Sequence, residues 1–315
     1  MGNKLVLTGV TCNCGEVLAE QIANNFHKIH TKFLDGVFYI VRATSKSGYV
    51  EKLLGKENKR VGDITDAQFL KEIFVGADTV LHIAGIKYSK GIVEASVKNH
   101  VRRLILVHTT GIYSKYKSAS KEYKEIEKNI YGICKKNHIK LTILRPTMIY
   151  GKINDKNMCV FIKMVDVLPI MPVVNQAKYG LQPVHYTDVG KACYNILVNE
   201  TKTENRDFIL SGKEAILLRE IFIIIGEKLG KKVKFLSCPF PLAYMGAWII
   251  WGFSFGKLDY REKVQRLCEP RIFSYKKAAR DFSYAPMTFQ EGVIKEVKEY
   301  LMEKKKRQDH GRRMG

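Results

Sequence analysis

The sequence predicts an α/β protein with a doubly wound parallel sheet and a smaller, mixed α/β lobe towards the C-terminus. Short runs rich in β-branched residues alternate with helical stretches over the first half of the 315 residues. The runs are too apolar for a sheet that exposes one face to solvent. After Arg145 this alternation gives way to irregular stretches and helices. Alternating strands and helices predict parallel strands covered on both faces and joined by right-handed crossovers.

The individual elements of the first half follow from their apolar patterns. Buried strands are expected at Leu5–Leu7, Val37–Val41, Thr79–Ile83, Leu104–Val107 and Leu141–Leu144, with a further short strand before Gly62. Apolar stripes at helical spacing predict the helices between them. One stripe is formed by Leu18, Ala19, Ile22 and Ala23, and another by Ile126, Ile130 and Ile133 on a helix ending near Lys136. Further helices are expected at Leu217–Leu229 and Thr288–Met302.

The chain is strongly basic, with 53 Lys and Arg against 31 Asp and Glu and a net charge of +22. Such a surplus favours anionic partners, namely phosphate-bearing small molecules, nucleic acid or a membrane face. A Lys-rich solvated surface explains the same number. Because no nucleic-acid-binding motif accompanies the charge, no nucleic acid partner is expected. The basic tail at 304–315 is expected to be solvated and mobile.

Seven cysteines form no CxxC pair and show no metal-ligand spacing. Their odd number predicts reduced thiols and a cytoplasmic protein, and no signal-peptide pattern opposes this expectation. No HExxH motif or zinc-finger spacing is present, so no metal is expected.

Ser237–Gly256 is a segment of twenty residues without a charge, flanked by lysines. It is just long enough to span a bilayer. Pro239, Pro241 and three glycines favour a buried or interfacial helix instead. Contact with a membrane surface is therefore the alternative to burial.

The turn after the first strand has the features of a dinucleotide-binding loop. Gly9 permits a tight turn off the strand, Gly15 permits close packing of helix on strand, and a helix N-terminus offers amide groups to a pyrophosphate. Cys12 replaces the middle glycine of such a loop. The predicted cofactor contacts in this Rossmann-type turn are Gly9, Thr11, Cys12, Asn13, Cys14 and Gly15.

Arg42 follows the second strand, where an acidic residue would bind the 2′-hydroxyl of NAD. A cation suits a 2′-phosphate, so NADP(H) is the preferred cofactor and NAD(H) the alternative. The alternative for Arg42 is a plain surface residue.

Several motifs in their order and spacing resemble the short-chain dehydrogenase/reductase superfamily, in its extended and atypical, NAD-dependent epimerase/dehydratase-like branches. The resemblance covers nearly the whole chain. It rests on Thr8–Gly15, Gly62–Asp63 with Asp66, His82–Gly85, Leu106–Thr110 before Tyr113, Leu144–Pro146 through Gly151, Gln182–His185 with Asp188, and Ala279–Pro286 with Phe289 and Gly292.

The resemblance implies that Asp63 and Ile64 contact adenine and that Ala84 and Gly85 border the nicotinamide ribose. Pro146 is counted with these cofactor-binding residues. The resemblance also implies an NAD(P)-binding domain at 1–200, a substrate lobe at 201–303 with parts of 151–182, and the tail at 304–315. Substrates of this superfamily are often nucleotide-diphosphate sugars. Arg261 and Arg271 are candidates for diphosphate contact, with a solvated role as the alternative.

The same resemblance implies a catalytic Ser/Thr, Tyr and Lys, the last two four residues apart on one helix. Thr109 matches the first. Counting back from Glu127 places Ala119 at the Tyr position and Tyr123 at the Lys position. Tyr116 would share a helical face with residue 123 if the helix begins early enough, and it is the predicted substitute acid. The YxxxK pattern at 113–117 precedes the helix and is interpreted as coincidence, and Tyr116 and Tyr123 have packing as their alternative role.

Two functions follow. The first is an NAD(P)-dependent oxidoreductase or epimerase acting on a nucleotide-linked or other anionic substrate, with a degenerate Tyr/Lys pair. The alternative is a non-catalytic NADP(H)-binding sensor, scaffold or membrane-associated accessory protein. A monomer and a homodimer remain open.

Overall fold

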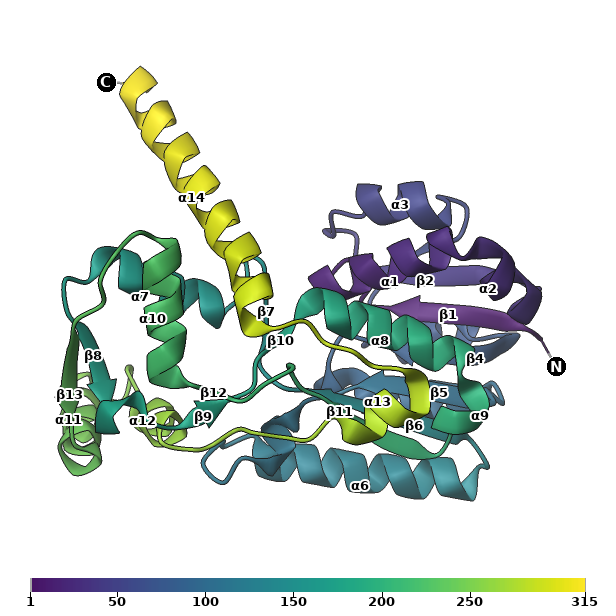
Figure 1. The fold of residues 1–315 in the computed structure, drawn as a ribbon. Helices are drawn as coiled ribbons and strands as arrows, with labels where there is room; N and C mark the ends of the chain where they lie inside the picture. The colour runs from purple at the N-terminus through teal and green to yellow at the C-terminus, as the bar shows by residue number, and fades with distance from the viewer. Residues whose placement is uncertain (1, 315) are drawn as a thin grey trace.

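The computed structural model describes residues 2–314 and confirms the doubly wound parallel sheet. Seven strands pair in the order β11-β6-β5-β4-β1-β2-β3, and every pairing is parallel (Figure 1). The strands are β1 (Lys4–Thr8), β2 (Val37–Val41), β3 (Lys59–Val61), β4 (Ala77–His82), β5 (Arg103–Val107), β6 (Lys140–Pro146) and β11 (Arg206–Leu210). Because the strand order reverses between β1 and β4, a crevice is expected beyond their carboxyl ends.

Helices cover both faces of this sheet, so alternate residues of one strand enter different cores. In β1, Leu5 and Leu7 belong to one apolar cluster, whereas Val6 belongs to the other. The first cluster includes α1 (Asn13–Asn24), α2 (Phe26–Lys32), α3 (Gly48–Leu54), α8 (Tyr186–Val198) and α13 (Lys276–Phe282). The second includes α4 (Ala67–Ile73), α5 (Ser89–Lys98) and α6 (Ser120–Lys136).

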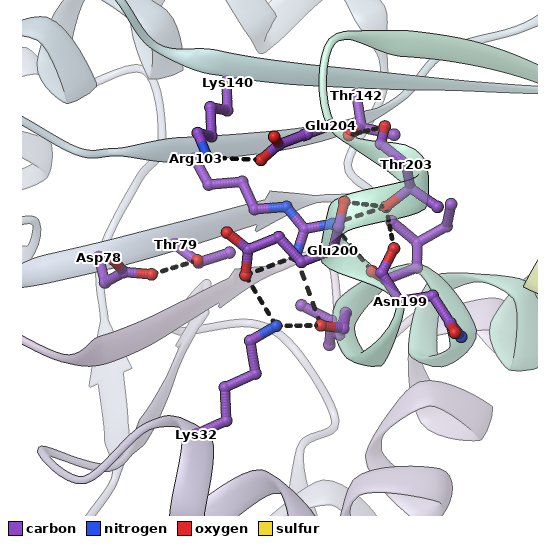
Figure 2. Close-up of polar contacts among 12 residues, drawn as sticks. Lys32, Asp78, Thr79, Arg103, Lys140, Thr142, Asn199, Glu200, Thr203 and Glu204 are labelled. Atoms are coloured by element: carbon purple, nitrogen blue, oxygen red, sulfur yellow. Dashed lines mark hydrogen bonds and ion pairs between the residues drawn. The ribbon is translucent and has the colours of Figure 1, made fainter.

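A charged network stabilises the sheet at the amino-terminal ends of its central strands (Figure 2). The fully buried Arg103 of β5 donates to the carbonyl of Ile196 at 2.8 Å and to Thr203 Oγ1 at 3.0 Å. Glu200 in α9 (Glu200–Thr203) lies beside it and pairs with Lys32 at 2.8 Å. Burial of a charge is tolerated here because carbonyl, hydroxyl and carboxylate oxygens surround it.

A smaller lobe packs around its own apolar cluster. Its elements are α7 (Met158–Val167), β8 (Met171–Val174), β9 (Gly180–Leu181), α10 (Leu218–Lys228), β12 (Ile216–Leu217), β13 (Phe235–Cys238), α11 (Phe240–Phe253) and α12 (Arg261–Leu267). Short strands β7 (Ile149–Tyr150) and β10 (Val184–His185) pair where the two lobes meet. One strand of the large sheet, β11, lies after residue 200 in the sequence. The domain boundaries expected from the sequence, 1–200 and 201–303, stay predictions.

The C-terminal helix is longer than the sequence predicts. α14 runs from Phe289 to Met314, so the expected tail at 304–315 is helical as far as the structure describes it, and Gly315 lies outside the described residues. Tyr300 donates to Asp166 Oδ2 at 2.7 Å and Lys304 pairs with the same carboxylate. These bonds hold the helix to α7, and Lys, Arg and Gln favour its continuation. Its last turns project from the body in Figure 1.

Candidate cofactor and substrate site

The loop from Gly9 to Gly15 makes the predicted turn between β1 and α1. Gly9 has a φ of +79°, and a Cβ there would lie 2.8 Å from the amide nitrogen of Ala84. A Cβ on Gly15 would lie 2.4 Å from the carbonyl oxygen of Gly9. Both positions therefore require glycine, the first for its conformation and the second for its close packing.

Cys12, which replaces the middle glycine, is the N-cap of α1. Its Sγ accepts a hydrogen bond from the Gly15 amide at 3.3 Å. Hydrogen bonds from the Cys14 side chain and from the backbone amides of Gly15 and Cys14 lower the pKa of the Cys12 thiol to about 7. The sulfur thus engages one helix-terminal amide, and it lies beside the amides that would face a pyrophosphate.

A cavity of about 390 Å³, here named the first cavity, opens beyond the carboxyl ends of β1, β2 and β4. The predicted cofactor residues that line it are Gly9, Thr11, Cys12, Arg42, Asp63, Ile64 and Ala84. Of the others, Asn13 instead bonds to Asn154 at 2.9 Å, and Cys14 and Gly15 are buried. Gly85 follows the lining residue Ala84, and its carbonyl oxygen bonds to His82.

The first cavity fits the adenosine half of a dinucleotide. Its volume is within the range of ligand pockets, and it lies at the strand-order reversal where such ligands bind. At its rim the Asp63 carboxylate accepts the Thr65 amide at 2.8 Å; this bond lowers the pKa of Asp63, and nearby Arg42 adds to the effect. Among the described residues, no carboxylate lies within ion-pair distance of Arg42.

His82 supports the first cavity from beneath. Its Nδ1 bonds to Thr8 Oγ1 at 2.6 Å and its Nε2 to the carbonyl oxygen of Gly85 at 3.0 Å. The side chain is fully buried, and this burial lowers its pKa to about 4. The neutral ring therefore links β1, β4 and the turn at Gly85.

The depressed pKa of His82 predicts loss of stability in acid. Between pH 6.5 and 4 the unfolded chain binds a proton that the folded chain does not, so His82 lowers the free energy of unfolding as pH falls, by about 3 kcal/mol. Urea unfolding of His82→Gln at pH 4.5 and pH 7 is expected to show a smaller acid loss than the wild type. An equal loss in both proteins would place the acid sensitivity elsewhere, for example at His185, whose pKa burial also lowers to about 4.

A second cavity of about 420 Å³ lies between the sheet and the smaller lobe. Three cations reach it, namely Lys117, Arg266 and Arg271. The Nε atoms of both arginines are buried without a partner among the described residues. Burial and the neighbouring Arg266 lower the pKa of Arg271 to about 10 and also lower the pKa of Lys117. Arg266 also pairs with Glu262, its Nη1 3.6 Å from Glu262 Oε1, whereas no ion pair within 4 Å holds Lys117 or Arg271 among the described residues. Cations held this closely favour an anionic ligand.

The acidic residue of the second cavity is already engaged. Glu269 accepts a hydrogen bond from Ser114 Oγ at 2.6 Å and another from the Lys115 amide at 2.7 Å. The carboxylate therefore orders the 114–117 turn, and the three cations remain the groups available to a ligand.

Thr109 and Pro146 also line the second cavity, where the predicted catalytic and nicotinamide-side residues belong. The Thr109 hydroxyl accepts the Gly111 amide at 3.0 Å. The two predicted tyrosines are elsewhere. α6 begins at Ser120, so Tyr116 precedes the helix, does not share its face with residue 123, and is 44% exposed outside the lining of both cavities. Tyr123 is 9% exposed and packs with Ile86 and Ile112.

Lys117 is a candidate that the sequence reasoning missed. Its Nζ lies 4.8 Å from the ring centroid of Tyr123, the residue at the expected Lys position. A Cβ built on Gly111 would lie 2.7 Å from Lys117 Nζ and 3.2 Å from Thr109 Oγ1, so both groups border the same backbone position. Tyr113 lines the second cavity too. The YxxxK pattern at 113–117, interpreted as coincidence, was the available signal.

A buried network places these groups. The Glu127 carboxylate bonds to His108 Nδ1 at 2.9 Å and to Arg145 Nη2 at 2.6 Å. Burial opposes its ionisation, but these partners hold the pKa of Glu127 below its ordinary value. The network joins α6 to β5 and β6, and so fixes the neighbours Thr109 and Pro146.

Of the two predicted diphosphate ligands, only Arg271 reaches the second cavity. Arg261 stacks on Trp248 and Trp251, its Cζ 4.3 Å from each ring, and pairs with Asp259 at 2.7 Å.

Comparisons with known proteins agree with this architecture. A family model described as NAD(P)H-binding matches residues 28–161. The N-acetyl-α-D-glucosaminyl-diphospho-ditrans,octacis-undecaprenol 4-epimerase of Escherichia coli O157:H7 is 21% identical over 287 residues, which cover 79% of this chain and 86% of the epimerase.

Two solved structures share the fold over nearly their whole length. The dTDP-glucose 4,6-dehydratase DesIV of Streptomyces venezuelae, solved with NAD, has a TM-score of 0.70 at 15% identity, covering 95% of this chain and 97% of that one. The UDP-glucuronic acid 4-epimerase of Bacillus cereus, solved with UDP-glucuronic acid and NAD, has a TM-score of 0.70 at 15% identity, covering 94% and 98%. As its motifs predict, this chain contains an NAD(P)H-binding domain and has the Rossmann-type fold of the epimerase/dehydratase-like short-chain dehydrogenases/reductases.

Proposed function

We propose that this protein is an NADP(H)-dependent oxidoreductase or epimerase whose substrate is a sugar linked to a diphosphate, such as a nucleotide sugar. The observation that carries the proposal is the second cavity. There the Thr109 hydroxyl and the Lys117 amine line the same cavity as Pro146, while Arg266 and Arg271 supply positive charge and two Nε groups that have no partner among the described residues. A reacting sugar and an anionic linker need these two kinds of group in one cavity.

The relatives support the substrate class. UDP-glucuronic acid and dTDP-glucose are diphosphate-linked sugars, and the sugar of the E. coli epimerase is linked through a diphosphate to a polyprenol. The part these substrates share is a sugar on a diphosphate. Guanidinium groups bind such oxygens through charge-assisted, bidentate hydrogen bonds, which is the role proposed for Arg266 and Arg271.

The cofactor residues divide between the two cavities. Asp63 and Ile64 would border the adenine, Arg42 the 2′-phosphate, and the Gly9–Gly15 loop the pyrophosphate. Ala84, Gly85 and Pro146 would border the nicotinamide end. When bound, the cofactor supplies a site that accepts or returns a hydride.

The proton is assigned to Lys117. Burial and Arg266 lower the pKa of its amine, so a larger fraction is neutral near pH 7 and able to accept a proton. Thr109 would hold the substrate hydroxyl through a hydrogen bond, and Lys117 Nζ would take its proton. Tyr116 and Tyr123 stay as predictions for this role, and Tyr116→Phe is compared with the Lys117 variants.

Arg42 is expected to set the coenzyme preference. Arg42→Glu removes the partner of the 2′-phosphate and adds a repelling charge, so the Kd for NADPH is expected to rise at least tenfold while the Kd for NADH changes little. Fluorescence titration of both coenzymes measures this. Lys52→Glu, with the same charge change on an exposed residue of α3 outside the cavity lining, is the control. An equal loss in the control, or unchanged NADPH affinity in Arg42→Glu, would contradict the assignment.

The function itself is tested by ligand-dependent stability and turnover. A ligand at one hundred times its Kd adds about 2.7 kcal/mol to the free energy of unfolding. NADPH and UDP-glucuronic acid are both expected to raise the unfolding temperature, and incubation of the pair is expected to yield an epimerised or oxidised sugar by mass spectrometry and chromatography. Stabilisation by NADPH alone, with no turnover of any diphosphate-linked sugar tried, would favour the non-catalytic alternative, which Ala119 and Tyr123 at the Tyr and Lys positions support.

A further inference from the structure

Helix α11 presents an apolar face that the rest of the chain leaves uncovered. Phe253 is 85% exposed, and Phe255 just beyond the helix is 94% exposed. Leu242, Met245 and Ile249 are half exposed and follow one another at helical spacing on the side of Phe253. Ala247 is the buried residue of the helix. Soluble surfaces rarely gather this many large apolar side chains without a partner.

The helix is held in place and does not belong to the core of its lobe. Its first amide, on Phe240, donates to Asn175 Oδ1 at 2.9 Å. Trp248 and Trp251 stack against Arg261 of α12. None of the helices in residues 2–314 has the length and apolarity needed to cross a bilayer.

The residues that flank the helix in sequence are mainly basic, and the nearest acid after it, Asp259, is paired with Arg261. From Lys228 to Leu258 the chain contains five lysines and no acidic residue. Lys232 and Lys234 are exposed before the helix, and Lys257 is exposed after it. Apolar and aromatic side chains bordered by lysines are the pattern of a helix that lies in the interface of an anionic membrane. Each lysine near such a surface is attracted to the anionic headgroups.

We propose that the α11 face, defined by Leu242, Met245, Ile249, Phe253 and Phe255 and flanked in sequence by Lys232, Lys234 and Lys257, docks on the surface of an anionic lipid bilayer. A second copy of the chain fits less well, because a symmetric pairing of this face would bring the flanking lysines of both copies together. The inference is independent of the proposed reaction. It does place a docking helix next to α12, whose Arg266 lines the second cavity.

The two tryptophans of the chain, Trp248 and Trp251, both lie in α11 and make the test direct. Full-length protein is mixed with vesicles of phosphatidylcholine containing 30 mol% phosphatidylglycerol, and with vesicles of phosphatidylcholine alone. We expect co-sedimentation and a blue shift of tryptophan emission with the anionic vesicles, and binding at least tenfold weaker to the neutral ones.

Matched variants distinguish binding through the α11 face from nonspecific binding through other exposed apolar side chains. Phe253→Ser with Phe255→Ser is expected to weaken vesicle binding at least tenfold, and Lys232→Glu with Lys234→Glu to abolish the preference for anionic lipid. Leu34→Ser with Val75→Ser removes two side chains that are 65% and 64% exposed on the larger lobe, and is expected to bind as the wild type does. All variants are checked for an unchanged unfolding temperature and for NADPH binding.

Three outcomes would overturn the proposal. One is an absence of binding to anionic vesicles by the wild type. Another is equal binding by the Phe253 and Phe255 variant. The third is a lipid-free dimer, measured by light scattering, that this variant converts to monomer without any vesicle binding, which would assign the face to a second copy of the chain.

Discussion

Replacing Lys117 with Met is expected to lower kcat for a diphosphate-linked sugar by at least about a hundredfold, because proton transfer by a positioned side chain contributes about 10²–10⁴-fold. Coenzyme affinity is expected to stay close to that of the wild type, since Lys117 lines the second cavity and the coenzyme's adenosine half is assigned to the first. Met keeps most of the aliphatic stem of Lys117, so the variant isolates the loss of the amine.

The control for this prediction lies two residues away. Lys115 is exposed and outside the second cavity, and Lys115→Met removes the same charge from the same turn. It should retain full turnover. Tyr116→Phe compares the residue that the sequence predicts for the same role: loss of turnover in Tyr116→Phe with retention in Lys117→Met would transfer the assignment to Tyr116.

A pH profile distinguishes proton transfer from simple charge. If the Lys117 amine is the base, kcat of the wild type rises with pH until the amine is deprotonated, and this rise is expected to be absent from the residual activity of Lys117→Met. Lys117→Arg keeps a charge but has no neutral form at accessible pH. Turnover that survives in Lys117→Arg would mean that the cation only binds substrate.

Arg145→Met is expected to lower the free energy of unfolding by about 3–5 kcal/mol, because it leaves one partner of a buried ion pair uncompensated. The Arg145 and Glu127 side chains are each 5% exposed and bond through two nitrogens, with Nε to Oε1 at 3.0 Å and Nη2 to Oε2 at 2.6 Å. Without the guanidinium, His108 is the remaining partner of the carboxylate.

Urea unfolding measures this loss of stability. Repeating it at several pH values shows whether the loss grows or shrinks as the pH rises. In Arg145→Met the folded pKa of Glu127 rises above its unfolded value, so the variant loses stability as pH increases through that window and its deficit is smallest near pH 4–5. The double variant Arg145→Met with Glu127→Leu is expected to recover part of the loss. Arg206→Ala breaks a more exposed pair with Asp281, and a cost above about 1 kcal/mol there would show that burial is not what matters.

The strands, the crossover helices and the strand-to-helix loop could all be predicted from the amino-acid sequence. These features are local. An apolar strand is recognised by its composition, and the two glycines that the backbone of the loop requires, Gly9 and Gly15, lie in one segment of seven residues. Arg42 was predictable for the same reason, since it immediately follows β2. The first cavity therefore contains residues that the sequence predicted.

The tertiary structure alone decided which side chains meet in the second cavity. Arg266 and Arg271 are about 150 residues from Lys117, and nothing in their spacing shows that the smaller lobe brings them beside Thr109. Tyr116 was predicted from helical spacing, but α6 begins only at Ser120. The residues before it, 114 and 115, bond to Glu269 from a distant part of the chain, a contact that local spacing does not reveal. Equally, the apolar pattern of 237–256 is compatible with burial or exposure, and only the packing of the lobe leaves one face of α11 uncovered. These features depend on contacts between residues that are far apart in the sequence, and local sequence patterns carry no information about such contacts.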